Sequence, residues 1–147
     1  MLEGTKEVNI LVYGAGAIGC HIGYCMYEAG NTVYLLGRGE HYKQMKENGM
    51  HIKICDNEIL KHEQVINEDS MFYIMDDVKR IKDVKFDYIF ITVKLSDYNE
   101  NALQSLYPLL EKIQLLFLLV QSFLSGGSTI LRENLMKDSR ILILTNK

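Results

Sequence analysis

Residues 9–19 read NILVYGAGAIG, and this stretch decides the fold of the chain. Residues Val8 to Tyr13 form a short, nearly continuous apolar run, which is typical of a strand buried on both faces. Residues Ala17 to Ala29 then carry Ile18, Ile22 and Met26 at helical spacing. A buried strand that leads through a glycine-rich turn into a helix is the repeating unit of parallel α/β sheets.

The turn Gly14-Ala15-Gly16-Ala17-Ile18-Gly19 matches the dinucleotide-binding pattern G-x-G-x-x-G. In that pattern the first glycine permits a tight turn, the second lets a pyrophosphate approach the backbone, and the third lets the helix pack closely on the strand. The free N–H groups and the partial positive charge at the helix N-terminus attract phosphate. We therefore predict that these six residues bind a dinucleotide. The alternative is a tight strand-to-helix turn without a ligand.

The rest of the chain alternates short apolar runs with helical patterns. Strands are expected at residues 32–36, 50–55, 88–93, 115–120 and 140–144, and helices at residues 41–48, 97–110 and 125–137. Residues 56–85 are polar and less clear, with Val65-Ile66 and residues 71–75 as candidate short strands. This order predicts an α/β fold: a Rossmann-type, doubly wound and mostly parallel sheet in three layers. We expect residues 1–147 to form one dinucleotide-binding domain.

The end of the second predicted strand indicates which dinucleotide is bound. NAD-binding proteins carry Asp or Glu about 20 residues after the glycine turn, where it binds the ribose hydroxyl. Here residues 32–36 are followed by Gly37 and Arg38, with Glu40 lying past the strand end. The guanidinium of Arg38 can pair with a 2′-phosphate, so NADP(H) is favoured over NAD(H). The alternative is an arginine that only faces solvent.

Polar residues also follow two later predicted strands. Lys94 ends the strand at 88–93, while Gln121 and Ser122 follow the strand at 115–120. Ligands of such sheets bind beyond the carboxyl ends of the strands. Lys94 is therefore a candidate contact for phosphate, ribose or a substrate carboxylate, and Gln121 and Ser122 for the nicotinamide side. Each is alternatively an ordinary polar residue after a buried strand.

Composition excludes several other classes of protein. The net charge of -3 and the pI near 5.8 supply no basic stripe for nucleic acid or an anionic membrane. The three cysteines form no C-x-x-C pair and the four histidines are scattered, so no metal site is expected. The N-terminus lacks the pattern of a signal peptide, and no apolar stretch is long enough to span a membrane. We expect a cytoplasmic protein with free thiols.

Several of these stretches together resemble the ketopantoate reductases (2-dehydropantoate 2-reductases). The resemblance rests on NILVYGAGAIG at 9–19, on residues 31–38 with their terminal arginine, and on Ile91-Thr92-Val93-Lys94. The resemblance continues in Asn48-Gly49, which closes the next predicted helix, and in Tyr-Pro-Leu-Leu at residues 107–110, before the strand at 115–120. It therefore runs through nearly the whole chain. It implies NADPH-dependent reduction of 2-dehydropantoate to pantoate, on the route to pantothenate and coenzyme A. Gly14, Gly16 and Gly19 would bind the pyrophosphate, Arg38 the 2′-phosphate, and Lys94 would lie near the nicotinamide.

Two features depart from that family. Gln121-Ser122-Phe123 stands where the family has Gln-Asn-Gly, so an amide near the substrate is replaced by a hydroxyl. Family enzymes also add a helical C-terminal domain, which supplies the lysine that acts as general acid, whereas this chain stops at Lys147. Reduction of a ketone needs a proton donor, and no catalytic residue is assigned here.

We therefore expect a truncated relative that binds NADPH and catalyses little or nothing alone. Loss of the second domain is expected to expose apolar surface, which favours a homodimer. Two alternatives stay open at this stage. One is a non-catalytic nucleotide-binding module, and the other is a reductase that acts on another 2-keto acid.

Overall fold

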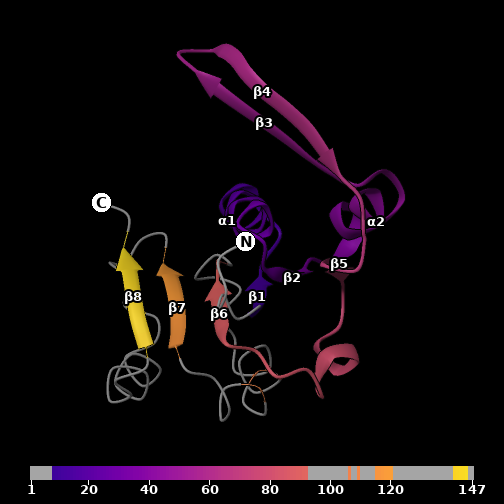
Figure 1. The fold of residues 1–147 in the computed structure, drawn as a ribbon, viewed down its shortest axis with the longest axis vertical. Coiled ribbons are helices and arrows are strands. Elements are labelled where there is room, and N and C mark those ends of the chain that lie inside the picture. Colours follow the sequence, from indigo (N-terminus) through magenta and orange to yellow (C-terminus); the bar gives the residue numbers. More distant parts are fainter. Residues whose placement is uncertain (1–7, 93–105, 107–108, 110–114, 121–140, 146–147) are drawn as a thin grey trace.

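The computed structural model describes residues 8–92, 106, 109, 115–120 and 141–145. Its elements in chain order are β1 (Asn9–Tyr13), α1 (Ala17–Glu28), β2 (Thr32–Leu36), α2 (Gly39–Asn48), β3 (Met50–Asp56), β4 (Ile59–Ile66), β5 (Phe72–Met75), the 3₁₀ helix η1 (Val78–Ile81), β6 (Tyr88–Ile91), β7 (Leu115–Val120) and β8 (Ile141–Thr145). Six strands form one sheet in the order β5-β2-β1-β6-β7-β8, and every neighbouring pair is parallel (Figure 1). The predicted Rossmann-type α/β fold is confirmed.

The strand order reverses between β1 and β6. From β1 the chain moves outward through β2 to β5, and then returns to the other side of β1 with β6, β7 and β8. The carboxyl ends of β1 and β6 therefore lie next to each other, with Tyr13 in register with Ile91. Open parallel sheets bind their ligands in the crevice at such a switch point.

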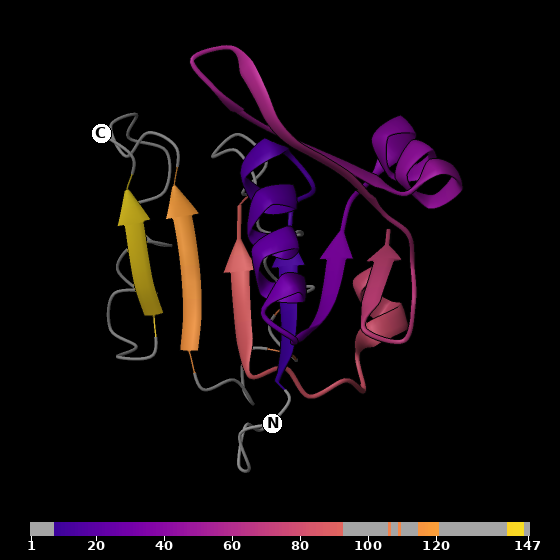
Figure 2. The same cartoon turned by 45° about the horizontal axis from the view of Figure 1, so that its top comes forward.

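One face of the sheet is covered by α1, which lies in front of the strands in Figure 2. The helix approaches closely because Gly23, which is buried, faces Val33 and Leu35 on β2. A Cβ atom at Gly23 would lie 3.7 Å from Val33 Cγ1 and 3.9 Å from Leu35 Cδ1, which is ordinary contact. Residues of different strands of the sheet, such as Ile10 on β1 and Phe72 on β5, are buried in the same core.

The second face of the sheet is buried as well. Leu11 on β1 and Ile89 on β6 point to this face, and both are fully buried. Tyr34 on β2 stacks on Tyr73 of β5, with ring centroids 4.7 Å apart, and meets the edge of Phe86. Residues buried on both faces explain why these strands read as continuous apolar runs in the sequence.

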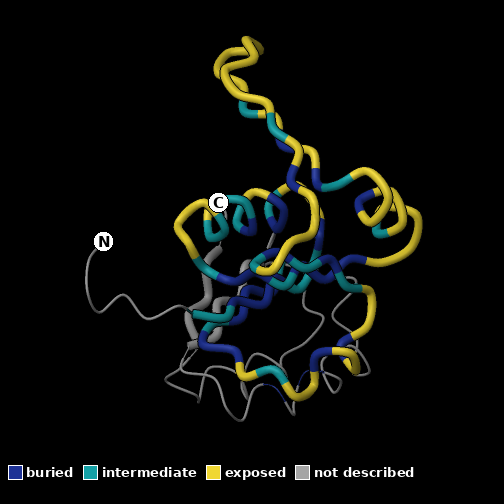
Figure 3. Tube along the Cα trace, turned by 45° about the vertical axis from the view of Figure 1, so that its right-hand side comes forward, coloured by how far each residue is buried: buried dark blue, intermediate teal, exposed yellow. Residues whose placement is uncertain are grey.

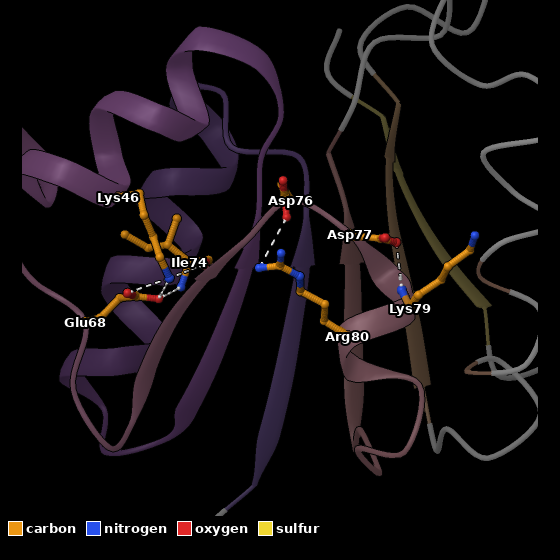
Figure 4. Close-up of polar contacts among 7 residues, drawn as sticks. All are labelled: Lys46, Glu68, Ile74, Asp76, Asp77, Lys79 and Arg80. Carbon is orange, nitrogen blue, oxygen red and sulfur yellow. Dashed lines mark hydrogen bonds and ion pairs between the residues drawn. The ribbon is translucent and has the colours of Figure 1, made fainter.

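The outer edge of the sheet, strand β5, is held by a carboxylate instead of a further strand. Glu68 Oε1 accepts a hydrogen bond of 2.8 Å from the backbone N–H of Ile74 and one of 2.7 Å from Lys46 Nζ on α2 (Figure 4). Lys46 Nζ also donates to the carbonyl of Ile74 at 3.2 Å. A lone edge strand exposes unpaired backbone groups, and these bonds satisfy both polar groups of Ile74.

The strand at residues 50–55 was predicted as part of the parallel sheet, and this placement is wrong. The observed strand, β3, instead pairs with β4 in an antiparallel hairpin that forms a separate two-stranded sheet. The hairpin projects from the body of the molecule and is exposed toward its tip (Figures 1 and 3). Its turn places Asn57 and Glu58 at φ values of 47° and 65°, the left-handed region that two-residue hairpin turns require. The strand that pairs with the outer side of β2 in the main sheet is β5.

Most other element predictions agree with the structure to within two residues. The strands at 32–36 and 115–120 have the predicted bounds, α1 ends one residue early, and α2 begins two residues early. The candidate strand at 65–66 is the end of β4, and the one at 71–75 agrees with β5 to within one residue. The helix predicted at 125–137 lies outside the described residues, as does all but residues 106 and 109 of the helix predicted at 97–110. In the described part, no helix combines the length and apolar content needed to cross a membrane.

Replacement of Phe72 by alanine tests whether β5 belongs to the folded sheet. Phe72 is fully buried, and the ring of Tyr27 on α1 meets it edge-on at 5.4 Å. We expect Phe72→Ala to lower the free energy of unfolding by about 3–5 kcal/mol, because it leaves a cavity in the core. Ile59→Ala on the hairpin is the control, since Ile59 is 61% exposed. Equal effects of the two changes in urea denaturation would contradict this assignment.

Candidate dinucleotide-binding site

The glycine turn joins the end of β1 to the start of α1. Gly14 has φ of +120°, a backbone conformation that only glycine adopts readily. Its N–H donates to the carbonyl of Leu36 at 3.0 Å, which ties the turn to the end of β2. Gly16 is the N-cap of α1 and is exposed, and because β1 ends at Tyr13, the helix begins at the carboxyl edge of the sheet. No side chain caps this helix end.

Gly19 is the point at which α1 comes closest to the sheet. A Cβ atom built there would lie 1.8 Å from the carbonyl oxygen of Gly14 and 2.7 Å from Thr92 Oγ1. Thr92 follows β6, and its hydroxyl donates to the carbonyl of Gly14 at 2.9 Å. The backbone N–H of Thr92 donates to the carbonyl of Tyr13, also at 2.9 Å. Thr92 therefore fixes the turn from the β6 side of the switch point.

Gly16 has the opposite environment. A Cβ atom there would meet nothing within 4 Å, so the protein itself does not require a glycine at this position. Its φ of -76° and ψ of -172° are also open to any residue. The free space in front of the N-cap is what a pyrophosphate needs in order to reach the backbone.

The end of β2 is the second part of the site. Gly37 is buried and donates its N–H to the carbonyl of Met75 on β5 at 2.9 Å. Arg38 comes next, is exposed and serves as the N-cap of α2. Arg38 therefore lies at the carboxyl edge of the sheet, one strand away from the glycine turn, as the sequence predicted.

Cys20 supports the turn from inside the first turn of α1. Its Sγ donates to the carbonyl of Ala15 at 3.3 Å, and the residue is buried. Burial raises the pKa of the Cys20 thiol to about 11. The thiol is therefore a neutral donor at physiological pH and belongs to the scaffold of the turn.

The structure brings together seven of the ten residues that the sequence proposed for the site. The six residues of the turn and Arg38 lie at adjoining strand ends, whereas Lys94, Gln121 and Ser122 lie outside the described residues. Sequence reasoning gave no role to Thr92 or Gly37. A threonine directly after a buried strand, and a glycine directly before the arginine, were the available signals. Among the described residues, no group of three or more His, Cys, Asp or Glu side chains is placed to hold a metal ion.

The parallel sheet and the glycine turn at its switch point together define a Rossmann-like fold of the dehydrogenase and reductase type. The family model described as ketopantoate reductase PanE/ApbA matches residues 10–123 of this sequence. The chain therefore belongs to the ketopantoate reductase family. No curated protein matches it significantly.

Solved structures of dehydrogenases and reductases are similar to this chain. D-mandelate dehydrogenase, solved with NADH and anilino(oxo)acetate, is 25% identical with a TM-score of 0.72, over 93% of this chain and 40% of that one. The 2-dehydropantoate 2-reductase of Methylococcus capsulatus is 19% identical with a TM-score of 0.60, over 94% and 40%. A PanE/ApbA family ketopantoate reductase from Ralstonia eutropha JMP134 is 16% identical with a TM-score of 0.52, over 93% and 40%. The chain thus spans about 40% of the length of these structures.

Gly19→Ala and Gly16→Ala separate the structural glycine of the turn from the exposed one. We expect Gly19→Ala to lower the free energy of unfolding by at least about 3 kcal/mol, because the added methyl overlaps a backbone carbonyl. Gly16→Ala, which adds the same methyl into open space, should change that free energy by less than about 1 kcal/mol. Chemical denaturation measures both. A well-tolerated Gly19→Ala would show that α1 does not pack as described.

The buried thiol of Cys20 predicts a specific pH dependence of stability. Because the pKa of Cys20 in the folded protein, about 11, exceeds the ordinary value of 9.0, the folded state holds this proton more tightly. Below pH 9 the thiol is protonated in both states and its titration does not change the free energy of unfolding. As the pH rises from 9 toward 11, that free energy falls, by about 1 kcal/mol at pH 10. Cys20→Ala should remove this part of the fall between pH 8 and pH 10. An equal fall in the variant would contradict the assignment.

Proposed function

We propose that this chain binds NADP(H) across the ends of β1 and β2, as the cofactor-binding part of a ketopantoate-reductase-type oxidoreductase. The observation that carries the proposal is the pairing of an open glycine turn with an arginine at the adjacent strand end. The turn offers backbone N–H groups and a helix dipole to a pyrophosphate. Arg38 offers a guanidinium to a 2′-phosphate.

The residues fit the cofactor on three points. The space in front of Gly16 is open, so backbone N–H groups can be reached by an anion. No acidic residue lies within the turn or in the first turn of α1, where a carboxylate would repel phosphate. Arg38 is exposed at the same edge of the sheet, one strand away from the glycine turn, so a ligand that enters from solvent can meet its side chain.

The role proposed for this chain is to bind the cofactor and to orient it. NADPH, when bound, supplies the hydride for reduction of a keto group. The turn fixes the pyrophosphate through the backbone, and Thr92 holds the turn against β6 through the carbonyl of Gly14. The substrate class we propose is a 2-keto acid, with 2-dehydropantoate as the first candidate because of the family.

NAD(H) is the second candidate cofactor, because the D-mandelate dehydrogenase that is 25% identical to this chain was solved with NADH. The difference between the two cofactors is the 2′-phosphate alone. The contribution of Arg38 therefore decides between them, and the deciding measurement is an affinity ratio.

Arg38→Ala should weaken the binding of NADPH much more than the binding of NADH. The loss of one exposed charge-assisted contact to phosphate is worth about 1.5–3 kcal/mol, which corresponds to about a 10- to 150-fold rise in the NADPH dissociation constant. Calorimetric titration of NADPH and NADH into the chain and its variant measures the ratio directly.

Lys53→Ala on the hairpin is the matched control, since it removes one positive charge from β3, which belongs to a separate two-stranded sheet. Its NADPH affinity should stay close to that of the unchanged protein. Similar weakening of both dinucleotides by Arg38→Ala would refute contact with a 2′-phosphate. Absence of binding by either dinucleotide would refute the proposed function as a whole.

A further inference from the structure

Gly37 lies between the two parts of the proposed site. Its position would place a Cβ atom 3.0 Å from the Cβ of Ala15, in the middle of the glycine turn. The same atom would lie 3.2 Å from Met45 Cε on α2 and 3.7 Å from Tyr42 Cβ. The glycine turn and the segment that carries Arg38 therefore touch at this residue.

Both sides of this contact are fixed by backbone hydrogen bonds. On the turn side, Gly14 N–H donates to the carbonyl of Leu36, the residue directly before Gly37. On the β5 side, Gly37 N–H donates to the carbonyl of Met75. These two bonds, at 3.0 and 2.9 Å, tie the end of β2 to the glycine turn on one side and to β5 on the other.

The two close neighbours differ in how they would respond to a methyl group at Gly37. Met45 Cε is the far end of a flexible side chain and can shift at small cost. Ala15 Cβ is attached directly to the backbone of the turn and is buried, so it moves only if the turn moves. A methyl group at Gly37 would therefore push the glycine turn and the Arg38 segment apart.

We propose that Gly37 is a positioning residue that sets the separation between the pyrophosphate turn and Arg38. This inference rests on the proposed function, because it concerns how one ligand reaches both parts of the site. A side chain at this position removes no group from either part and changes the distance between them. A ligand that needs both parts, NADPH, then loses more affinity than NADH, which lacks the 2′-phosphate.

The test uses a clash and its compensation. Gly37→Ala adds the methyl group, Ala15→Gly removes the group that it meets, and the double variant carries both changes. We expect Gly37→Ala to raise the dissociation constant of NADPH about tenfold and that of NADH by less than about threefold. The double variant should recover most of the lost NADPH affinity, which is a coupling that separate sites do not show.

Gly23→Ala is the matched control, because the same methyl group there meets only ordinary contacts of 3.7 Å or more. Its NADPH-to-NADH affinity ratio should equal that of the unchanged chain. If Gly37→Ala does not fold, Ala15→Ser enlarges the same contact from the other side, and the same drop in the affinity ratio is expected.

An unchanged ratio in Gly37→Ala, or a folded double variant without recovery, overturns the positioning role. Dinucleotide binding by the unchanged chain would leave the proposed function standing in that case. If the unchanged chain binds neither NADPH nor NADH, the proposed function itself fails and the positioning role fails with it.

Discussion

The closeness of α1 to the end of β1 is the constraint on which the rest of this structure depends. A single hydrogen atom in place of a side chain at Gly19 lets the helix rest against the carbonyl of Gly14. The same carbonyl accepts the hydroxyl of Thr92, so one backbone oxygen joins β1, α1 and the end of β6. The N-terminus of α1 then faces the switch point of the sheet, where the backbone N–H groups of the turn are accessible to an anion.

The ends of three neighbouring strands contribute to the site in different ways. In the proposed site, the end of β1 would supply backbone groups of the glycine turn and the end of β2 the cation of Arg38. The end of β6 supports the turn through the hydrogen bond from Thr92 to the carbonyl of Gly14. Hydrogen bonds from Gly14 to Leu36 and from Gly37 to Met75 extend this connected backbone to β5. Residues of the candidate site that lie far apart in the sequence are thus linked by hydrogen bonds of the main chain.

Much of the fold was predictable because its strands are buried on both faces and its helices carry a clear period. The arrangement of residues 50–75 was not predictable from the same signals. Met50, Ile52 and Ile54 alternate with polar residues as any half-buried strand does, and the turn at Asn57-Glu58 lacks the glycine that marks most two-residue hairpins. The importance of Gly37 and Thr92 depends on distances of about 3 Å between residues far apart in the sequence, which no local pattern encodes.

The β3–β4 hairpin lies outside the hydrogen-bond network of the main sheet. The six parallel strands are paired among themselves, and the hairpin joins the core mainly at its base, where Met50, Ile52 and Ile66 are buried. An isolated two-stranded hairpin is marginal in water. The molecule therefore contains two levels of cooperativity. The outer half of the hairpin can open and exchange its amide protons with solvent while the sheet, and the glycine turn on it, stay closed.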